Sequence, residues 1–251
     1  MNDHDLAAHI AKIAGELLLK IRAEATSTGI SETDLKALGD SRSNDLILAE
    51  LAKHRPNDAV LSEESKDDLV RLSADRVWIV DPVDGTREYS EGRSDWAVHV
   101  ALVSSGAPIA ASVALPGARL VLNMEPVVER APATDGSLRL VVSRTRSPAL
   151  NTYLAETLNM ELVAMGSAGA KAMSVLLGVS DVYAHAGGQY EWDSCAPVGV
   201  ARAAGLHCSR LDGSDLIYNN ENPYLPDLLI CRPELAGLML ENIAQAPQSL
   251  A

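Results

Sequence analysis

Apolar residues recur at helical spacing at two places near the start of the chain. In the first, steps of three and four residues predict an amphipathic helix, whose apolar positions are Leu6, Ile10, Ile13, Leu17 and Ile21. In the second, Leu46, Ile47 and Leu51 predict another helix, which ends before Pro56. The chain is therefore expected to begin with two helices.

Shorter apolar runs follow, and most of them are typical of strands. Residues 59–62 predict a strand, residues 67–73 a short helix, and residues 76–80 a β-rich run that stops at Asp81-Pro82. Proline cannot donate a hydrogen bond to a strand pair and biases the preceding residue away from helix. Residues 96–103, 109–115 and 120–122 predict further strands of a meander or mixed sheet.

The composition changes at residues 131–136 (APATDG), and the pattern changes with it. Beyond this segment, predicted strands and helices alternate, which favours layered α/β packing. The predicted strands are residues 138–142, 162–165 and 182–185, and the predicted helices are residues 148–158, 168–177, 193–204 and 234–244. We therefore divide the chain into an N-terminal half, residues 1–135, and a C-terminal half, residues 136–251.

A formal net charge of −13 restricts the partners of this protein. Affinity for nucleic-acid polymers comes largely from Lys and Arg contacts to phosphates, so such a polymer is not an expected partner. If the substrate is itself an anion, a local positive charge must offset the repulsion. Metal ions held by clustered carboxylates are the natural source of that charge.

The cysteines and the N-terminal residues indicate the cellular compartment of the protein. Cys195, Cys208 and Cys231 are odd in number, widely spaced and without zinc-binding spacing, so we expect reduced thiols in a cytoplasm. The first residues do not form a signal peptide, and no segment reaches the ~20 apolar residues of a membrane span. The sequence predicts a cytoplasmic protein with no membrane partner.

The most informative segment is WIVDPVDGTR, residues 78–87. Asp81 and Asp84 are expected in a loop directly after a buried strand, where Pro82 stiffens the turn and Gly85 permits an unusual backbone angle. Carboxylate oxygens and a main-chain carbonyl suit a hard cation such as Mg²⁺, and backbone N–H groups suit a phosphate oxygen. The alternative is an ordinary turn whose aspartates only cap the backbone.

Two further acidic segments are ambiguous when taken singly. In LSEES, Glu63 and Glu64 are adjacent, so on a strand they point to opposite faces and only one reaches a given metal; a solvated pair is the alternative. In EWDSCAP, Asp193 precedes a run of small and apolar residues. It is expected either to cap a helix or to be held there as a metal ligand.

Two basic or titratable positions complete the candidates. In GSAGAK, Lys171 lies in the first turn of a predicted helix, where the helix dipole disfavours a cation. A substrate phosphate would offset that cost, and a side chain extending to solvent is the alternative. His99 falls within a strand pattern and is interpreted as a satisfied sheet histidine.

Taken together and in this order, the motifs resemble the lithium-sensitive phosphatase superfamily. The shared features are an acidic pair, DPVDGT some twenty residues later, and EWDSCAP about a hundred residues further on, and the resemblance extends from about Asp40 to Gly205. That superfamily includes inositol monophosphatase, fructose-1,6-bisphosphatase and the 3′(2′),5′-bisphosphate nucleotidases. The resemblance implies an α/β (α+β) fold, a layered α-β-α-β-α sandwich of two packed halves with the active site between them.

The resemblance also implies a role for each matching residue. One Mg²⁺ ion would be held by Glu63, Asp81 and the Val83 carbonyl, and a second by Asp81, Asp84 and Asp193, with Glu64 near a third, weaker ion. Thr86, assisted by Asp40, would orient the attacking water, and the N–H groups of Gly85 and Thr86 would hold the phosphate. Asp40 is assigned by its offset from Leu46 and its place ahead of the second helix; Asp45 remains an alternative.

The substrate is expected to be a small phosphate monoester. Inositol monophosphatases usually carry a glutamate where this chain has Ala186, whereas bisphosphate nucleotidases usually carry a lysine like Lys171 and a motif like SRTR, residues 143–146. Ser143, Arg144 and Lys171 are then candidates for a distal phosphate, and His185 and Asp193 for further substrate contacts. The preferred substrate is 3′-phosphoadenosine 5′-phosphate, followed by its sulfate-bearing relative, which implies a place in sulfur assimilation.

The same motifs are also compatible with three alternative functions. They are hydrolysis of inositol 1-phosphate or fructose 1,6-bisphosphate, and a metal-binding scaffold without turnover. A threonine beside two metal ligands favours an enzyme, because a scaffold has no need of it. The family resemblance also implies lithium sensitivity and a homodimer.

Overall fold

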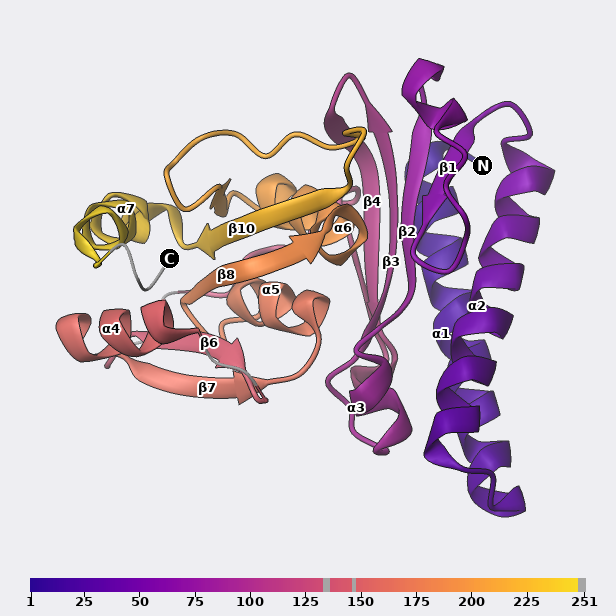
Figure 1. Ribbon diagram of the computed structural model, residues 1–251, viewed down its shortest axis with the longest axis horizontal. Helices are drawn as coiled ribbons and strands as arrows, with labels where there is room; N and C mark the ends of the chain where they lie inside the picture. Colours follow the sequence, from indigo (N-terminus) through magenta and orange to yellow (C-terminus); the bar gives the residue numbers. More distant parts are fainter. Residues whose placement is uncertain (133–135, 146–147, 248–251) are drawn as a thin grey trace.

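The computed structural model describes residues 1–132, 136–145 and 148–247, and these form five layers (Figure 1). Two long helices, α1 (Asp3–Thr28) and α2 (Glu32–His54), form the first layer. A five-stranded sheet, a pair of inner helices, a second five-stranded sheet and an outer pair of helices follow. This is the α-β-α-β-α sandwich that the family resemblance implies.

The first sheet has the strand order β1-β2-β3-β4-β5. Its strands are β1 (Ala59–Ser62), β2 (Val77–Asp84), β3 (Ala97–Ser104), β4 (Ala107–Leu115) and β5 (Leu120–Asn123). Strand β1 runs parallel to β2, and the remaining neighbours are antiparallel. The parallel pair places the ends of β1 and β2 at the same edge of the sheet, where Glu63 and Asp81 lie.

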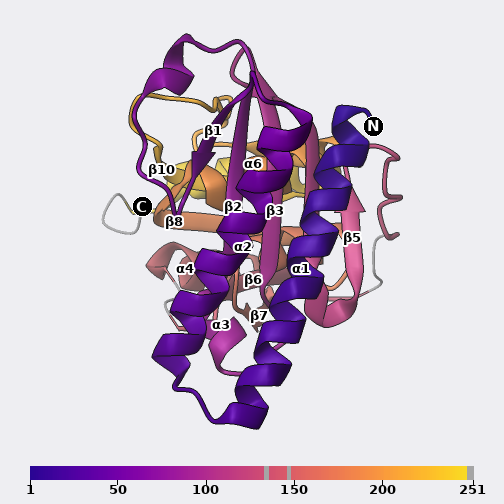
Figure 2. The ribbon, with the colours of Figure 1, turned by 90° about the vertical axis from the view of Figure 1, so that its right-hand side faces the viewer.

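Helices α1 and α2 cover one face of this sheet (Figure 2). Each begins at a residue that caps its first turn: the side chain of Asn2 accepts a hydrogen bond from the Asp5 N–H, and that of Ser31 from the Asp34 N–H. Their apolar faces pack with Trp78 and Val98 in one continuous cluster. Burial of this face, rather than helix propensity alone, stabilises the pair.

The second sheet has the strand order β7-β6-β8-β10-β9. Its strands are β6 (Arg139–Ser143), β7 (Glu161–Met165), β8 (Val182–Tyr190), β9 (His207–Ser209) and β10 (Tyr224–Cys231). Strands β7 and β8 run parallel to β6, and β10 runs antiparallel to both β8 and β9.

Helices α5 (Ala168–Leu176) and α6 (Glu191–Ala203) lie between the sheets, and α6 packs closely on β4. Helices α4 (Ala149–Leu158) and α7 (Ala236–Gln245) cover the outer face of the second sheet (Figure 1). Short elements complete the chain: α3 (Thr86–Ser90) and the 3-10 helices η1 (Val70–Ser73), η2 (Pro116–Ala118) and η3 (Pro233–Leu235). No helix in the described ranges is long and apolar enough to cross a membrane.

The structure corrects several element boundaries. Helix α2 begins at Glu32, so Asp40 lies inside it and not ahead of it, because the Ser31 cap starts the helix earlier than the apolar pattern does. Strand β8 continues past His185, which is therefore within a strand and not at its end. Strand β10 was not predicted: Pro226 interrupts its pattern and falls where the β8 pairing shifts register.

Two predicted features remain untested. The boundary between the halves falls on residues 133–135, which lie outside the described residues, so the division at 135 and 136 stays a prediction. Arg146, the last residue of the SRTR motif, also lies outside them.

Candidate active site

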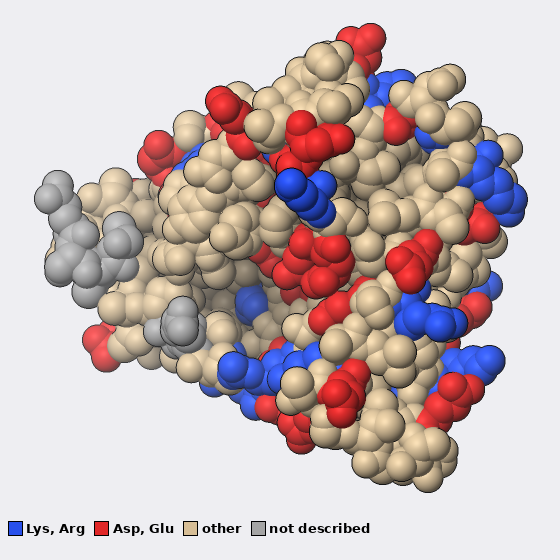
Figure 3. Space-filling model, turned by 45° about the vertical axis from the view of Figure 1, so that its right-hand side comes forward, with Lys and Arg blue, Asp and Glu red and all other residues tan. Residues whose placement is uncertain are grey.

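A pocket of about 760 Å³ lies between the two halves of the chain. Its lining comes from the ends of β1 and β2, from α3, and from β6, α5, β8 and α6. On the surface, acidic side chains gather in this hollow with basic side chains beside them (Figure 3). Both sheets are therefore needed to build the site.

Asp81 to Asp84 form the end of strand β2 and not a loop after it. The β2–β3 pairing runs from Asp81 opposite His99 to Asp84 opposite Ala97, with an irregularity between these pairs where Pro82 and Val83 lie. Such a bulge redirects side chains, and it accommodates a proline that a regular ladder excludes. The Asp81 carboxylate accepts a hydrogen bond from the Val83 N–H at 3.0 Å, which fixes the bulge.

Asp193 reaches the same point from the second half of the chain. It is the third residue of α6 and not its cap, and its carboxylate accepts a hydrogen bond from the Tyr190 N–H at 2.6 Å. One carboxylate oxygen from each of Asp81, Asp84 and Asp193 lies within 4.8 Å of the others. The structure thus brings together three of the predicted ligands.

Glu63 is the fourth carboxylate of this group and follows β1. Its N–H continues the parallel pairing by donating to the Val80 carbonyl at 3.4 Å. Burial and the charge of Asp193 raise the pKa of Glu63 to about 7, and burial and the charge of Glu63 raise that of Asp81. Burial and the charge of Asp84 raise the pKa of Asp193 to about 6.

This donor set fits divalent cations. Four carboxylates and the Val83 carbonyl offer only oxygen, the donor that Mg²⁺ prefers. Burial first, and then the charges of the neighbouring carboxylates, raise the pKa values of Glu63, Asp81 and Asp193, and a cation placed among them would offset both effects. The predicted ligands Glu63, Asp81, Val83, Asp84 and Asp193 all line the pocket, so they could hold metal together.

Asp84 differs from its neighbours because cations and N–H donors surround it. Its carboxylate accepts hydrogen bonds from the Ala168 N–H at 3.1 Å and the Gly169 N–H at 2.6 Å, and its Oδ2 lies 3.2 Å from Nε2 of His99. Burial opposes ionisation, but His99, Lys171 and these donors outweigh it and lower the Asp84 pKa. Asp84 therefore joins β2 to the start of α5.

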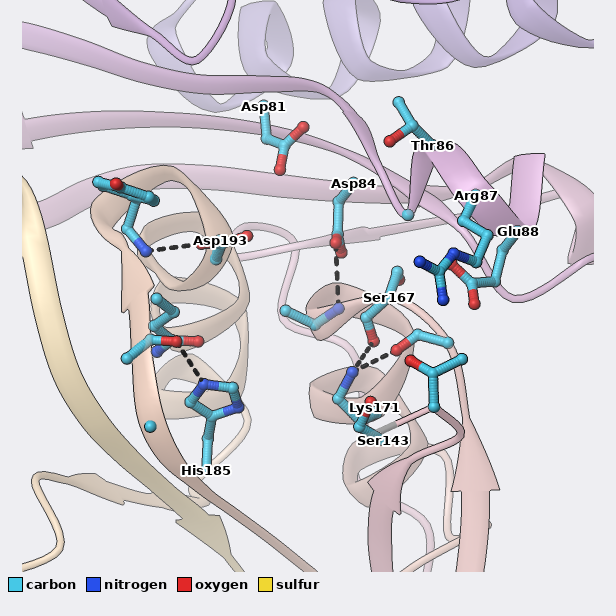
Figure 4. A pocket seen from close by; sticks show the side chains of 18 of the residues that line it. Asp81, Asp84, Thr86, Arg87, Glu88, Ser143, Ser167, Lys171, His185 and Asp193 are labelled. Atoms are coloured by element: carbon cyan, nitrogen blue, oxygen red, sulfur yellow. Dashed lines mark hydrogen bonds between the residues drawn. The ribbon is translucent and has the colours of Figure 1, made fainter. Parts of the chain in front are cut away.

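Gly85 and Thr86 lie where β2 turns into α3. Gly85 has a φ of +86°, and a Cβ there would come within 2.8 Å of Cβ of Ser167, so both backbone angle and space favour glycine. Thr86 is the first residue of α3, and Figure 4 shows it on the same side of the pocket as Asp81 and Asp84. Both residues line the pocket, as predicted for phosphate contacts.

Lys171 lies across the pocket from these residues (Figure 4). It is only 5% exposed, so the predicted alternative of a side chain extending to solvent is wrong. Its Nζ donates to the carbonyl oxygens of Gly166 and Ser167, the latter at 2.8 Å. Burial lowers the Lys171 pKa, while Asp84 and other nearby carboxylates oppose that shift.

The remaining substrate candidates are placed differently. Ser143 and His185 line the pocket, and His185 Nε2 lies 2.9 Å from the Gly188 carbonyl. Arg144 donates instead to Glu88 and Glu91, each at 2.8 Å, and is not among the lining residues. Its guanidinium group is therefore already paired.

Asp40 and Glu64 lie near one another, but neither is among the residues that line the pocket. Burial and the charge of Glu64 raise the Asp40 pKa to about 7. Asp45, the alternative to Asp40, is exposed on α2. Helix α2 is fixed to the metal segment by Ser43, whose hydroxyl donates to the Pro82 carbonyl at 2.8 Å.

Two residues in or next to the pocket were missed or underrated from the sequence: Arg87, which lines it, and His99, which lies behind Asp84. His99 was interpreted as a satisfied sheet histidine, yet it contacts a predicted metal ligand, Asp84. Arg87 was not singled out, although it is exposed, lines the pocket and follows the DGT motif directly. Only the strand register could have revealed His99, because it lies opposite Asp81 on the neighbouring strand.

Comparison with known proteins agrees with this geometry. A model described as the inositol monophosphatase family matches residues 3–248, and the chain belongs to that family. A 3′-phosphoadenosine 5′-phosphate phosphatase of Mycobacterium bovis is 54% identical over 243 residues, covering 93% of this chain and 90% of the relative. A protein of the same name from Mycobacterium leprae is 48% identical over 264 aligned positions, covering 99% and 96%.

Among solved structures, CysQ from Bacteroides thetaiotaomicron is similar throughout. This bacterial member of the inositol monophosphatase family has a TM-score of 0.80 and 28% identity, covering 92% of this chain and 97% of the other. An inositol monophosphatase from Staphylococcus aureus has a TM-score of 0.81 at 19% identity, which shows the shared fold alone.

Proposed function

We propose that this protein is a Mg²⁺-dependent phosphatase that removes the 3′-phosphate of 3′-phosphoadenosine 5′-phosphate and releases AMP. The sulfate-bearing relative of that nucleotide is the second substrate. The names of the relatives at 54% and 48% identity, over nearly the whole chain, support this choice. It implies a role in sulfur assimilation, where the reaction clears a by-product.

The observation that carries the proposal is the pairing of opposite charges across one pocket. Asp81, Asp84 and Asp193 converge on one side, and Lys171 lies on the other (Figure 4). A cavity of about 760 Å³ is within the range that holds a small ligand such as a phosphorylated nucleoside. The arrangement supports binding of an anion between metal ions and a lysine.

We assign one ion to Glu63, Asp81 and the Val83 carbonyl, a second to Asp81, Asp84 and Asp193, and a third, weaker ion near Glu64. When bound, such ions neutralise phosphate charge, lower the pKa of a coordinated water and stabilise the leaving oxygen. Mg²⁺ is the proposed metal because all of these donors are oxygen atoms.

The residues of the chain position the reactants. Thr86 orients the water, and Asp40 accepts its proton, for which a pKa of about 7 is well matched. The water oxygen bonds to phosphorus, the P–O bond to the ribose breaks, and the leaving oxygen takes up a proton. The N–H groups of Gly85 and Thr86 hold the phosphoryl oxygens, and Ser143, Lys171 and His185 are the proposed contacts to the rest of the substrate. Arg144 would join them only by leaving Glu88 and Glu91.

The wider setting is also proposed. Cys195, Cys208 and Cys231 are buried free thiols, which supports a cytoplasmic location. A homodimer, expected from the family resemblance, stays a prediction. Hydrolysis of inositol 1-phosphate or fructose 1,6-bisphosphate, and metal binding without turnover, remain the alternative functions.

Phosphate release from three substrates tests the proposal directly. Each of 3′-phosphoadenosine 5′-phosphate, inositol 1-phosphate and fructose 1,6-bisphosphate is supplied with Mg²⁺ and, in parallel, with EDTA. We expect metal-dependent release with a kcat/KM at least about tenfold higher for the nucleotide, which corresponds to ~1.4 kcal/mol. A preference for inositol phosphate would reject the nucleotide, and absence of turnover on all three would support the scaffold.

A further inference from the structure

Exposed aromatic rings are confined to the rim of the pocket. The chain has only nine Trp and Tyr residues and no Phe, and most of those described are buried or half-buried. Tyr190 and Tyr224 are the two exposed ones, at 46% and 45%. Both line the pocket that holds the carboxylates. In a protein with so few aromatic residues, two exposed rings at one pocket indicate that they contact the ligand.

The two rings are fixed in place by the fold. Tyr190 and Tyr224 are directly opposite one another on β8 and β10, and their ring centroids lie 6.0 Å apart at an interplanar angle of 82°. Trp192 stacks on Tyr190 at 4.8 Å and 10°. The Tyr190 backbone is also held by its hydrogen bond to Asp193. The aromatic rim is thus directly linked to a metal ligand.

The backbone beside the rim makes room for these rings. Gly188 has a φ of +87°, and a Cβ at this position would overlap the Tyr224 hydroxyl group. The β8–β10 pairing shifts register here, between Leu225 and Asp227. A bulge next to a pocket commonly redirects a side chain toward it.

Gln189 adds a second and independent observation. This residue is only 6% exposed and lines the same pocket, yet neither its amide oxygen nor its amide nitrogen has a hydrogen-bond partner among the described residues. Leaving a buried amide unpaired costs free energy, so such groups normally have partners. An unpaired amide beside two exposed rings indicates a ligand that has a flat face and a polar edge.

We propose that Gln189, Tyr190 and Tyr224 form a subsite for the purine base of the substrate, with the rings packing on the base and the Gln189 amide pairing with its edge. An amide that offers one donor and one acceptor matches the N6–N7 edge of adenine, whereas hypoxanthine presents two acceptors, O6 and N7, at the same edge. This subsite rests on the proposed nucleotide function and names the residues that would distinguish a nucleotide from a sugar phosphate.

The test compares three substrates that differ only in the base. They are 3′-phosphoadenosine 5′-phosphate, its inosine counterpart, in which an oxo group replaces the adenine amino group, and the base-free methyl riboside 3,5-bisphosphate. Selectivity is the ratio of kcat/KM values between two of these substrates. A loss of activity that affects both substrates equally cancels in this ratio.

For the rings, we expect Tyr190→Ala and Tyr224→Ala each to lower the selectivity for the adenine substrate over the base-free one by about 5- to 150-fold. Tyr190→Phe, which keeps the ring, should retain it. Equal losses on both substrates would overturn the subsite, because the rings would then support the chemistry rather than the base. If the wild-type protein does not favour the adenine substrate over the base-free one, the subsite also fails.

For the amide, Gln189→Leu should abolish an adenine-over-inosine selectivity of about tenfold. It should not lower the thermal midpoint of the substrate-free protein, because it removes a buried amide that has no partner. Unchanged base selectivity, or a marked loss of stability, would overturn the role of Gln189. Poor turnover of all nucleotides alongside rapid inositol phosphate hydrolysis would instead reject the proposed function itself.

Discussion

Oδ2 of Asp84 lies 3.2 Å from Nε2 of His99, and both side chains are buried. The other ring nitrogen of His99, Nδ1, lies 2.9 Å from the Trp192 carbonyl oxygen, so both nitrogens face acceptors. Burial disfavours the charged ring, but Asp84 and the Trp192 carbonyl outweigh it and raise the His99 pKa. Strand β3 therefore places a buried imidazole, whose protonation Asp84 favours, beside a predicted metal ligand.

Replacing His99 should destabilise the protein. In His99→Leu, Asp84 keeps its N–H donors from α5 but loses the buried imidazole beside it, so we expect the free energy of unfolding to fall by about 1–3 kcal/mol. His99→Gln retains a donor and should lose less. Urea unfolding in EDTA measures both values. A leucine variant as stable as the wild type would show that the pair is not a net stabilising contact.

Asp81→Asn should separate metal binding from folding. Burial and the charge of Glu63 raise the pKa of Asp81, so ionisation of this carboxyl destabilises the metal-free fold; an amide does not ionise and should raise the thermal midpoint in EDTA at pH 8. We expect Mg²⁺ to give little further stabilisation, and phosphatase activity to fall by about 100-fold or more. Asp45→Asn, on exposed α2 surface, is the matched control and should change neither property. Retained turnover in Asp81→Asn at saturating Mg²⁺ would contradict the assigned role.

The effect of Mg²⁺ on stability should depend on pH. The pKa of Glu63 is about 7 and that of Asp193 about 6 in the metal-free fold, above ordinary carboxyl values, so the folded state keeps protons that the unfolded chain releases. Metal-free stability contributed by these groups therefore falls as pH rises toward and through 7. Bound Mg²⁺ replaces the protons, so its stabilisation should grow from pH 6 to pH 8.

Thermal unfolding at pH 6, 7 and 8, with EDTA and with Mg²⁺, measures this dependence. Ca²⁺ or Na⁺ at matched ionic strength separates the effect of Mg²⁺ from general screening. An equal Mg²⁺ effect at all three pH values would mean that protons and metal do not compete for Glu63 and Asp193.

Features that depend on a short stretch of sequence could be predicted, and features that depend on contacts between distant segments could not. The convergence of Asp81, Asp84 and Asp193 could be predicted because DPVDGT and EWDSCAP resemble compact motifs of a known family. Strand β1 could be predicted because its apolar run is bounded by polar residues. The role of His99 could not be predicted, because it depends on the register of β3 against β2. The role of Gln189 could not be predicted either, because the sequence around it does not reveal whether its buried amide forms a hydrogen bond.

The roles of Arg144 and Arg87 also depend on tertiary contacts that the sequence does not reveal. The SRTR resemblance singled out Arg144 for a distal phosphate, but in the structure its guanidinium group pairs with Glu88 and Glu91. Arg87 has no ion pair within the described ranges, is exposed, and lines the pocket beside Glu88 (Figure 4). Since a second phosphate needs an accessible cation, Arg87 is the better placed of the two.

Substitution of each arginine by alanine should distinguish these roles. We expect Arg87→Ala to raise the KM for 3′-phosphoadenosine 5′-phosphate by about tenfold, and to affect inositol 1-phosphate, which has a single phosphate, much less. Arg144→Ala breaks ion pairs to the buried Glu88 and the partly exposed Glu91 but removes no side chain that lines the pocket, so its effect on the KM values of both substrates should be small. Steady-state kinetics at constant ionic strength measure both. If Arg144→Ala raised the KM for 3′-phosphoadenosine 5′-phosphate more than Arg87→Ala did, Arg144 would have to leave Glu88 and Glu91 when substrate binds. The distal phosphate would then compete with these two carboxylates for the guanidinium group.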